Sequence, residues 1–490
     1  MHKILIYDDS VGASADARNL LKVNRFSHVY YRKRSLERWM SDIATAAGYQ
    51  FLKVDDAASR ESVGRLNQRA HDRLVVLYVP SCMAFACPEG DAVLFLRKLG
   101  LTRSALLVGK ENIDGDVRVA VAVDDKARAM VDAIATGTHP SELWREPSAA
   151  WNFVGDDVGI IDLRDPLAFT DYLTSNFDVR FFNSIQSDNE FVVVKRSTDK
   201  VKLHREYRFY GLLPPAMRMF FIQPYDYLDE GNHASYRMER LFVPDMSLQW
   251  IHGSFEREDF ERFLDKIFFF LASRPRQEGA AQAGQDAFVD AFRTKVMARR
   301  DQLMGLEAYA SIRPYIDASF GGYDSLLERY LKLLDTVSSQ ARTAGLCIGH
   351  GDLCFSNILY SKITGLLRLI DPRGADTEEE LYVSPYYDLA KLSHSVAGNY
   401  DYINHGLFRL EVDQDLRLAL QIDSAPPSWA RETFDRRLRE HGFEPAMIRI
   451  LEASLFLSMV PLHIDAPRKV LAFLTNADAI LRELEGQAEG

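Results

Sequence analysis

Two acidic residues and an amide stand close together in the segment from residue 350 to residue 371. Asp352 and Asn357 lie in one short stretch, and Asp371 follows the next apolar run. A carboxylate in a loop can accept the proton of a substrate hydroxyl group. The Asn357 carbonyl and the Asp371 carboxylate are hard oxygen ligands of the kind that Mg²⁺ prefers, with phosphates and waters completing its shell. The segment therefore predicts a site for a hydroxyl group beside a metal-bound phosphate.

Transfer of a phosphoryl group also needs a cation on the phosphates and a residue that fixes this cation. Lys195 ends the apolar run Phe191 to Val194, which is typical of a strand. Glu206 follows in a helix expected from about Asp199 to Leu213. A strand lysine that pairs with a glutamate on the next helix is the arrangement found in kinases.

The order His350, Asp352, Asn357 has the spacing H-x-D-x-x-x-x-N of a kinase catalytic loop, with a later metal-binding Asp. The run HGDLCFSNILY, followed by LRLIDPRG, resembles the aminoglycoside phosphotransferase and choline kinase superfamily, which has the protein-kinase-like fold. The resemblance implies that Asp352 positions and deprotonates the acceptor hydroxyl. It also implies that Asn357 and Asp371 hold magnesium, and that Asp388 in the following helix is structural.

The same resemblance implies where the nucleotide binds. Backbone groups from Glu239 to Leu241 would meet the base, and Lys195, fixed by Glu206, would neutralise the phosphates. Ser184 lies in the segment that precedes Lys195, where protein kinases have a Gly-rich loop that this chain lacks. The expected cofactors are Mg²⁺ and ATP or GTP.

Two further side chains near the acids have alternative roles. His350 is expected to make structural hydrogen bonds rather than to act as a base. Arg373 follows Asp371 and Pro372, and it either contacts phosphate or an acidic substrate or pairs with a nearby Asp or Glu.

The elements that position these residues change in character near residue 175. Before it, short apolar runs such as Leu74 to Val79 alternate with helical patterns such as Leu36 to Ala47, which predicts an α/β domain with a largely parallel sheet. From residue 178, two runs around Ser187-Asp188-Asn189 predict an antiparallel hairpin. From about residue 250 we expect mostly helix, except for residues 348 to 374.

We therefore predict three parts: an α/β domain over residues 1–175, then an α+β bilobal kinase-like domain. Its small antiparallel-sheet lobe covers 176–249 and its mostly helical large lobe covers 250–490. Residues 136 to 157 are expected to form a connection, and residues 272 to 286, which are low in complexity, a surface loop.

The first domain weakly resembles sugar-phosphate nucleotidyltransferases. The run Ser35 to Trp39 is similar to their early helix, but Asp8 to Gly12 replaces their Gly-rich loop. Val79 to Cys82 lacks the Asp expected there. The resemblance implies a degenerate domain that serves in binding or assembly.

Composition excludes some classes of protein. Fifty-nine basic and 70 acidic residues give a net charge of −11, which argues against broad binding to nucleic acid or anionic membranes. The four cysteines form no CxxC pair and are expected to be free thiols. A secretory signal is not expected, and the most apolar stretch that we identify, Ile267 to Ala272, is too short to span a membrane, so we expect a cytoplasmic protein.

The sequence thus favours a Mg-dependent phosphotransferase that moves the terminal phosphate of ATP or GTP to a hydroxyl of a small molecule. Fusion to a nucleotidyltransferase-like domain suggests a sugar or polyol acceptor, as in capsule or exopolysaccharide biosynthesis. Two alternatives stay open: an inactive pseudokinase-like binding module, and nucleotidyl transfer by the same fold. No oligomeric state is indicated.

Overall fold

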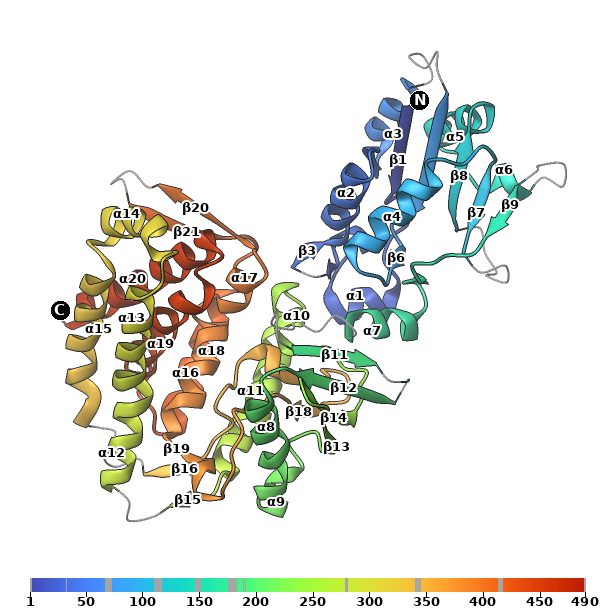
Figure 1. Ribbon diagram of the computed structural model, residues 1–490. Coiled ribbons are helices and arrows are strands. Elements are labelled where there is room, and N and C mark those ends of the chain that lie inside the picture. The colour runs from blue at the N-terminus through green and yellow to red at the C-terminus, as the bar shows by residue number, and fades with distance from the viewer. Residues whose placement is uncertain are drawn as a thin grey trace. The chain divides into compact units, whose positions relative to one another are not determined.

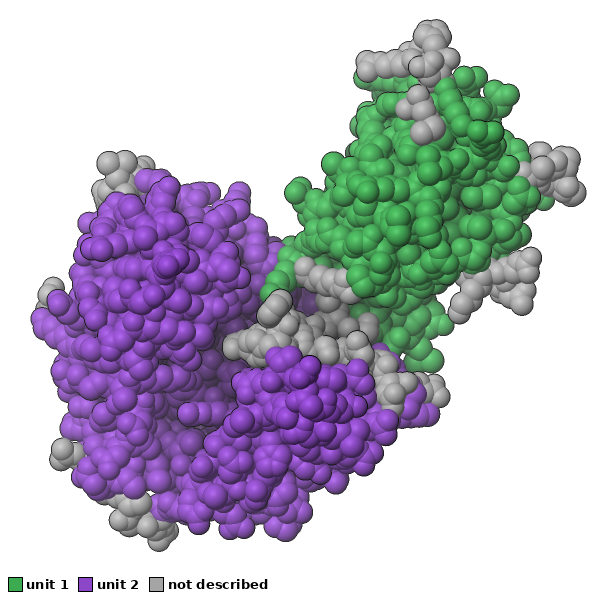
Figure 2. Space-filling model, in the orientation of Figure 1, with its two compact units in different colours: residues 1–176 green, residues 177–490 purple. Residues whose placement is uncertain are grey.

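The computed structural model divides the chain into two compact units, residues 1–176 and residues 177–490 (Figure 2). It describes residues 2–31, 33–66, 73–109, 117–145, 151–174, 183–187, 189, 191–277, 281–339, 345–412 and 417–488. Each unit contains sheets and a hydrophobic core of its own.

A six-stranded sheet forms the centre of the first unit, with the strand order β4-β1-β5-β8-β7-β9 (Figure 1). Its strands are β1 (His2–Asp8), β4 (Gln50–Val54), β5 (Leu74–Pro80), β7 (Leu106–Val108), β8 (Val119–Val123) and β9 (Asn152–Val154). Two short strand pairs accompany it: β2 (Tyr30–Tyr31) with β3 (Arg34–Ser35), and β6 (Met83–Phe85) with β10 (Ile160–Asp162).

Helices cover both faces of this sheet. They are α1 (Ala15–Leu21), α2 (Leu36–Ala46), α3 (Ala57–Gly64), α4 (Glu89–Leu99), α5 (Asp125–Thr136), α6 (Glu142–Arg145) and α7 (Pro166–Thr174). Val63 of α3 and Met130 of α5 pack with Ile4 and Ile6 of β1 on one face. On the other face Trp39 of α2 contacts Phe85. Burial on both sides explains the unbroken apolar run in β1.

The sheet of the first unit is largely parallel, as predicted, with one exception. β1 runs parallel to β4 and β5, and β7 runs parallel to β9. β8, however, runs antiparallel to both β5 and β7. The expected connection from residue 136 to residue 157 also contains α6 and the edge strand β9. β9 has three exposed residues, so it carries no apolar pattern that the sequence could reveal.

The second unit begins with a four-stranded antiparallel sheet in the order β11-β12-β14-β13. Its strands are β11 (Asn183–Ser187), β12 (Val192–Ser197), β13 (Pro224–Asp229) and β14 (Ala234–Glu239). The expected hairpin is confirmed by the pairing of β11 with β12. The expected helix is α8 (Lys200–Leu212), whose Leu203 packs on Val193 and Tyr236 of the sheet.

The rest of this unit is mainly helical (Figure 1). Its helices are α9 (Pro215–Arg218), α10 (Met246–Ile251), α11 (Arg257–Ser273), α12 (Ala281–Val289), α13 (Lys295–Met304), α14 (Tyr309–Phe320), α15 (Tyr323–Val337), α16 (Pro385–Val396), α17 (Tyr400–Asn404), α18 (Ser428–Glu440), α19 (Pro445–Met459) and α20 (Pro467–Ala488). Its strands are β15 (Arg276–Gln277), β16 (Leu346–Ile348), β17 (Ile358–Tyr360), β18 (Leu367–Leu369), β19 (Tyr382–Val383), β20 (Phe408–Val412) and β21 (Leu418–Ile422).

Two expectations for this region need correction. Residues 272 to 286 are not one surface loop, because β15 pairs with β16 and α12 begins at Ala281. The Ala and Gln residues there favour helix, although their low complexity suggested a loop. The hairpin β20–β21 was also not expected from the sequence.

Helix α19, with the 3-10 turn that follows it, is long and apolar enough to cross a membrane. This segment, Pro445–His463, has a mean hydropathy of 1.4, yet 89% of it is buried inside the unit. Packing in the core therefore accounts for its apolar sequence. All four cysteines are free and buried, as expected.

Two acidic side chains are crowded together at the start of α10. Asp245 caps this helix by accepting a hydrogen bond from the Leu248 N–H at 2.8 Å. Burial, together with the neighbouring charge of Asp401, raises the pKa of Asp245 to about 7. Burial raises the pKa of Asp401 as well.

A raised pKa means that the folded chain binds more protons than the unfolded chain between about pH 4 and about pH 7, so stability falls as the pH rises through this window. Asp245→Asn keeps the helix cap and removes the charge. We predict that the unfolding free energy of the variant minus that of the parent increases by on the order of 1–3 kcal/mol from pH 4 to pH 8. Urea unfolding at both pH values measures this gain, with exposed Asp465→Asn as the control. A difference that does not vary with pH would refute the prediction.

Candidate functional site

A buried lysine brings two other predicted site residues together. Lys195, on β12, is 1% exposed. Its Nζ atom lies 2.6 Å from Glu206 Oε2 on α8 and 2.8 Å from Asp371 Oδ1, just after β18. The strand lysine and the helix glutamate expected from the sequence therefore meet, and the second acid joins them. We call these three residues the ion triad.

The charges of the ion triad depend on one another. Burial alone would lower the pKa of Lys195, but the charges of Asp371 and Glu206 outweigh it and raise this pKa well above its ordinary value. Burial also raises the pKa of Glu206, against the opposing effect of Lys195. Glu206 is 5% exposed, and a small pocket beside it is lined partly by Phe209, Met238 and other apolar side chains.

The segment that carries Asp371 is fitted closely against α8. Ala375 N–H donates to the Arg205 carbonyl at 3.1 Å. The Arg205 guanidinium reaches back to Asp376 at 2.8 Å. A Cβ atom on Gly374, which has a φ of +85°, would lie 2.6 Å from the Arg205 backbone. Only glycine allows this approach, so Gly374 lets the segment that carries Asp371 pack directly on the backbone of α8.

The loop from His350 to Asn357 is held by its own hydrogen bonds. Asn357 Nδ2 donates to the Asp352 carbonyl oxygen at 2.8 Å, and Asp352 N–H donates to His350 Nδ1 at 3.2 Å. Ile370 N–H donates to the Asn357 carbonyl, and Arg373 N–H donates to the His350 carbonyl. These two bonds connect the loop that carries Asp352 to the segment that carries Asp371. We call the residues from 350 to 357 the catalytic loop.

His350 has the structural role that we expected. It is fully buried, its Nε2 atom lies 2.9 Å from the Ile370 carbonyl, and its ring stacks on Phe221. Burial lowers the pKa of His350. A neutral imidazole donates from Nε2 to the Ile370 carbonyl and accepts at Nδ1 from the Asp352 N–H, so it satisfies both hydrogen bonds.

A buried ion pair supports the catalytic loop from behind. Asp388, on α16, accepts hydrogen bonds from the N–H groups of His350 and Gly351 at 2.9 and 2.8 Å. Arg274 Nη1 lies 2.9 Å from Asp388 Oδ2, and both side chains are almost fully buried. The sequence indicated Asp388 as structural, but it gave no signal for Arg274, which lies far away along the chain.

A second lysine contacts the predicted base. Lys391 Nζ, also on α16, lies 2.8 Å from Asp352 Oδ1. This contact was not predicted from the sequence. The only signal was the place of Lys391 three residues after Asp388, which puts both side chains on one face of the helix.

The residues predicted to meet the nucleotide base, Glu239 to Leu241, lie at the end of β14, an inner strand of the small sheet, and not in the ion triad. Glu239 is exposed at the end of β14, where it pairs with Val192. Leu241 follows the strand, and its backbone groups have no partner among the residues that the structure describes. Ser184 stands opposite Arg196 on β11, and its side chain lies outside the described part of the chain.

Arg373 is exposed and forms no ion pair with any residue that the structure describes. Of the two roles left open by the sequence, pairing with a nearby acid is therefore not observed within the described ranges.

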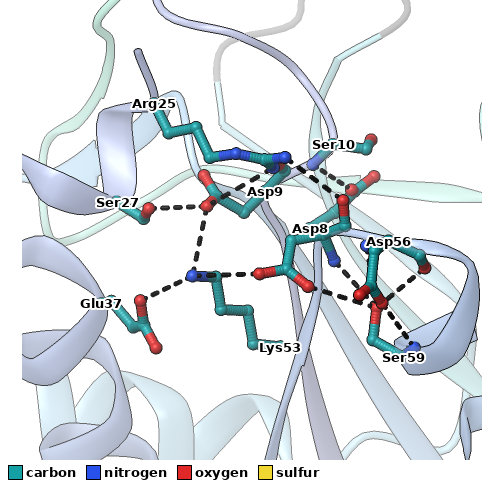
Figure 3. A network of polar contacts seen from close by, with 10 residues as sticks. Asp8, Asp9, Ser10, Arg25, Ser27, Glu37, Lys53, Asp56 and Ser59 are labelled. Atoms are coloured by element: carbon teal, nitrogen blue, oxygen red, sulfur yellow. Dashed lines mark hydrogen bonds and ion pairs between the residues drawn. The ribbon is translucent and has the colours of Figure 1, made fainter. Parts of the chain in front are cut away.

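The first unit has a polar network at the end of β1 (Figure 3). Buried Asp9 accepts a hydrogen bond from Ser27 Oγ at 2.6 Å and lies 3.5 Å from Lys53 Nζ. Lys53 also pairs with Glu37 at 2.8 Å. Tyr78 donates its hydroxyl to Asp8 at 2.6 Å. These acids are thus engaged by neighbouring side chains of the same unit.

Cys82 ends the run Val79 to Cys82, which lacks the Asp that the weak resemblance to nucleotidyltransferases implies. This thiol is fully buried, and burial, followed by the charge of Asp162, raises its pKa to about 12.

Solved structures of small-molecule phosphotransferases are similar to this chain. Aminoglycoside phosphotransferase APH(4)-Ia, a thermostable mutant, has 10% identity, a TM-score of 0.38 and coverage of 61% of this chain and 94% of its own. The Plasmodium vivax ethanolamine kinase has 13% identity and a TM-score of 0.38, covering 65% and 89%. APH(3'')-Id from Streptomyces rimosus has 14% identity and a TM-score of 0.36, covering 60% and 98%.

No family model matches the sequence, and no curated protein matches it either. At these TM-scores and identities, the function of the chain has to be inferred from its own residues.

The contact between Gly374 and α8 can be tested with a matched pair of glycines. Gly374→Ala puts a Cβ atom 2.6 Å from the Arg205 backbone, whereas Gly442→Ala, at a similar φ of +79°, meets nothing within 4 Å. We predict that Gly374→Ala costs about 1–3 kcal/mol more stability than Gly442→Ala and also weakens Mg-ADP binding. Urea unfolding and calorimetric titration measure both effects. Equal losses in the two variants would show that close packing on α8 is unimportant.

Proposed function

We propose that residues 177–490 transfer the terminal phosphate of ATP, or of GTP, to a hydroxyl group of a small molecule. The observation that supports this most strongly is the ion triad, because it places a buried cation beside a carboxylate from the segment that follows the catalytic loop. Phosphoryl transfer depends almost entirely on such positioned charges. A sugar or polyol acceptor remains the expectation from the sequence.

Asp352 is the proposed base. Its backbone is fixed at both the N–H and the carbonyl group, and its side chain is 40% exposed, so a substrate can reach it. The acceptor hydroxyl gives its proton to the Asp352 carboxylate. The hydroxyl oxygen forms the new bond to the terminal phosphorus, the bond to the bridging oxygen breaks, and the nucleoside diphosphate leaves.

Asn357 and Asp371 fit a Mg²⁺ ion by the chemistry of their donor atoms. Asn357 uses Nδ2 in its bond to Asp352, so Oδ1 is the atom that it can offer to a metal. Asp371 has a left-handed φ of +56° and a side chain that is 33% exposed. A bound Mg²⁺ would neutralise charge on the phosphates. Lys195 is the proposed cation for the phosphates themselves, with Glu206 retained as its partner.

The backbone of Leu241 is the proposed contact for the nucleotide base, since its polar groups are unused among the described residues. Glu239 would border the same position. Ser184 is the proposed contact in the segment that precedes Lys195.

For residues 1–176 we infer a role in binding or assembly, without nucleotidyl transfer. Support comes from the run Val79 to Cys82, which lacks the Asp that the resemblance implies, and from the engagement of Asp8 and Asp9 by their own neighbours.

Replacement of the base tests the proposal. Asp352→Asn keeps the size and the backbone contacts but cannot accept a proton. We predict a loss of turnover of about 10²- to 10⁴-fold, with unchanged affinity for Mg-ADP. ADP release from Mg-ATP and calorimetric titration measure the two quantities, with exposed Asp465→Asn as the control. Turnover close to that of the parent chain would contradict the assignment.

Replacement of Asp371 tests the proposed binding of Mg²⁺. We predict that Asp371→Ala weakens Mg-ATP binding by about tenfold or more, which corresponds to about 1.4 kcal/mol. Asp226→Ala is a matched control, because Asp226 has a similar φ of +51° but is exposed on β13. Titration in the presence and in the absence of Mg²⁺ measures the effect. An unchanged Mg-dependent affinity in Asp371→Ala would remove the metal role.

A further inference from the structure

One helix contacts the catalytic loop at two points. On α16, Asp388 binds the backbone of the loop at His350 and Gly351, and Lys391 binds the side chain of Asp352. Asp388 and Lys391 are separated by one helical turn and lie on the same face. The buried partner Arg274 fixes Asp388, so the helix is held firmly in its place behind the loop.

The ion pair between Lys391 and Asp352 is partly desolvated. The Lys391 side chain is 16% exposed, and that of Asp352 is 40% exposed. Such a pair is stronger than one on an open surface, where solvent screens both charges. It therefore restrains the Asp352 side chain, which its backbone contacts alone do not fix in rotation.

Three titratable groups near this pair, Cys354, Tyr400 and His394, are neutral. Burial raises the pKa of Cys354 to about 12 and raises the pKa of Tyr400. Burial and the charge of Lys391 lower the pKa of His394 well below its ordinary value. Burial would lower the pKa of Lys391, but the charge of Asp352 outweighs it and raises this pKa. The ammonium group is thus charged and directed at the carboxylate.

We propose that Lys391 is a positioning residue for phosphoryl transfer: it holds Asp352 Oδ1 so that Oδ2 faces the acceptor hydroxyl. This inference rests on the proposed function, in which Asp352 is the base. A displacement of about 1 Å in such a group can cost about 10²-fold in rate. The role requires a cation that reaches Asp352, and it predicts an effect on the rate of the reaction rather than on nucleotide binding.

The experiment uses the full chain and the release of ADP from Mg-ATP with water as the acceptor. Lys391→Met removes the charge at a similar length, and Lys391→Arg retains a charge. Lys469→Met is the matched control, because Lys469 is a half-buried lysine on α20, packed against Phe473. Mg-ADP affinity and melting temperature are measured for every variant.

We expect Lys391→Met to lower kcat about 10- to 100-fold, with less than about a twofold change in KM and in Mg-ADP affinity. Lys391→Arg should recover part of the rate, and Lys469→Met should match the parent chain. In an Asp352→Asn background, Lys391→Met should change the residual rate by less than about twofold, because both substitutions disable the same group.

Parent-like turnover by Lys391→Met would overturn the inference and leave the proposed function intact. A loss in the Asp352→Asn background as large as in the parent would overturn it too, because Lys391 would then act independently of Asp352. A fall in Mg-ADP affinity or melting temperature that accounts for the lost rate would reduce Lys391 to a structural residue. If the unsubstituted chain releases no ADP from Mg-ATP, either with water or with any sugar or polyol of a panel, the proposed function fails, and this inference fails with it.

Discussion

The ammonium group of Lys195 is the charge on which the rest of the site depends. Removing a charge from water costs several kcal/mol unless partners surround it. Lys195 is almost completely buried and has two partners, Glu206 from α8 and Asp371 from the segment after β18. Both elements must therefore stay docked on β12. A nucleotide phosphate that replaced Asp371 beside the lysine would exchange one anion for another, so the buried charge would never be left unpaired.

The catalytic loop is held in a similar way from the opposite side. Asp388 on α16 binds two backbone N–H groups of the loop, and the buried guanidinium of Arg274 balances its charge. Backbone hydrogen bonds from Ile370 and Arg373 then connect this loop to the segment that carries Asp371. Each of the proposed reactive groups is thus fixed by its neighbours without a bound substrate, which is the condition that catalysis by positioned charges would require.

Residues close together in the sequence were the ones that could be predicted. Asp352 and Asn357 have a fixed spacing within one loop, and Lys195 ends a strand with a clear apolar pattern. Arg274 and Lys391 act on partners far along the chain, and no local pattern indicates such a contact. The direction of β8 in the sheet of the first unit could not be predicted for the same reason. Its residues suit a strand of either direction, and only the neighbouring strands determine that it runs antiparallel.

The identity of the transferred group tests the central claim most directly. The purified chain would be incubated with Mg-ATP and a panel of sugars and polyols, and the products would be followed by ³¹P NMR and mass spectrometry. A site built from Lys195, Asp352, Asn357 and Asp371 predicts a new phosphate monoester, formed together with an equal amount of ADP. An acceptor that carries a nucleoside monophosphate, or a nucleotide that stays unchanged with every acceptor while it binds, would contradict it.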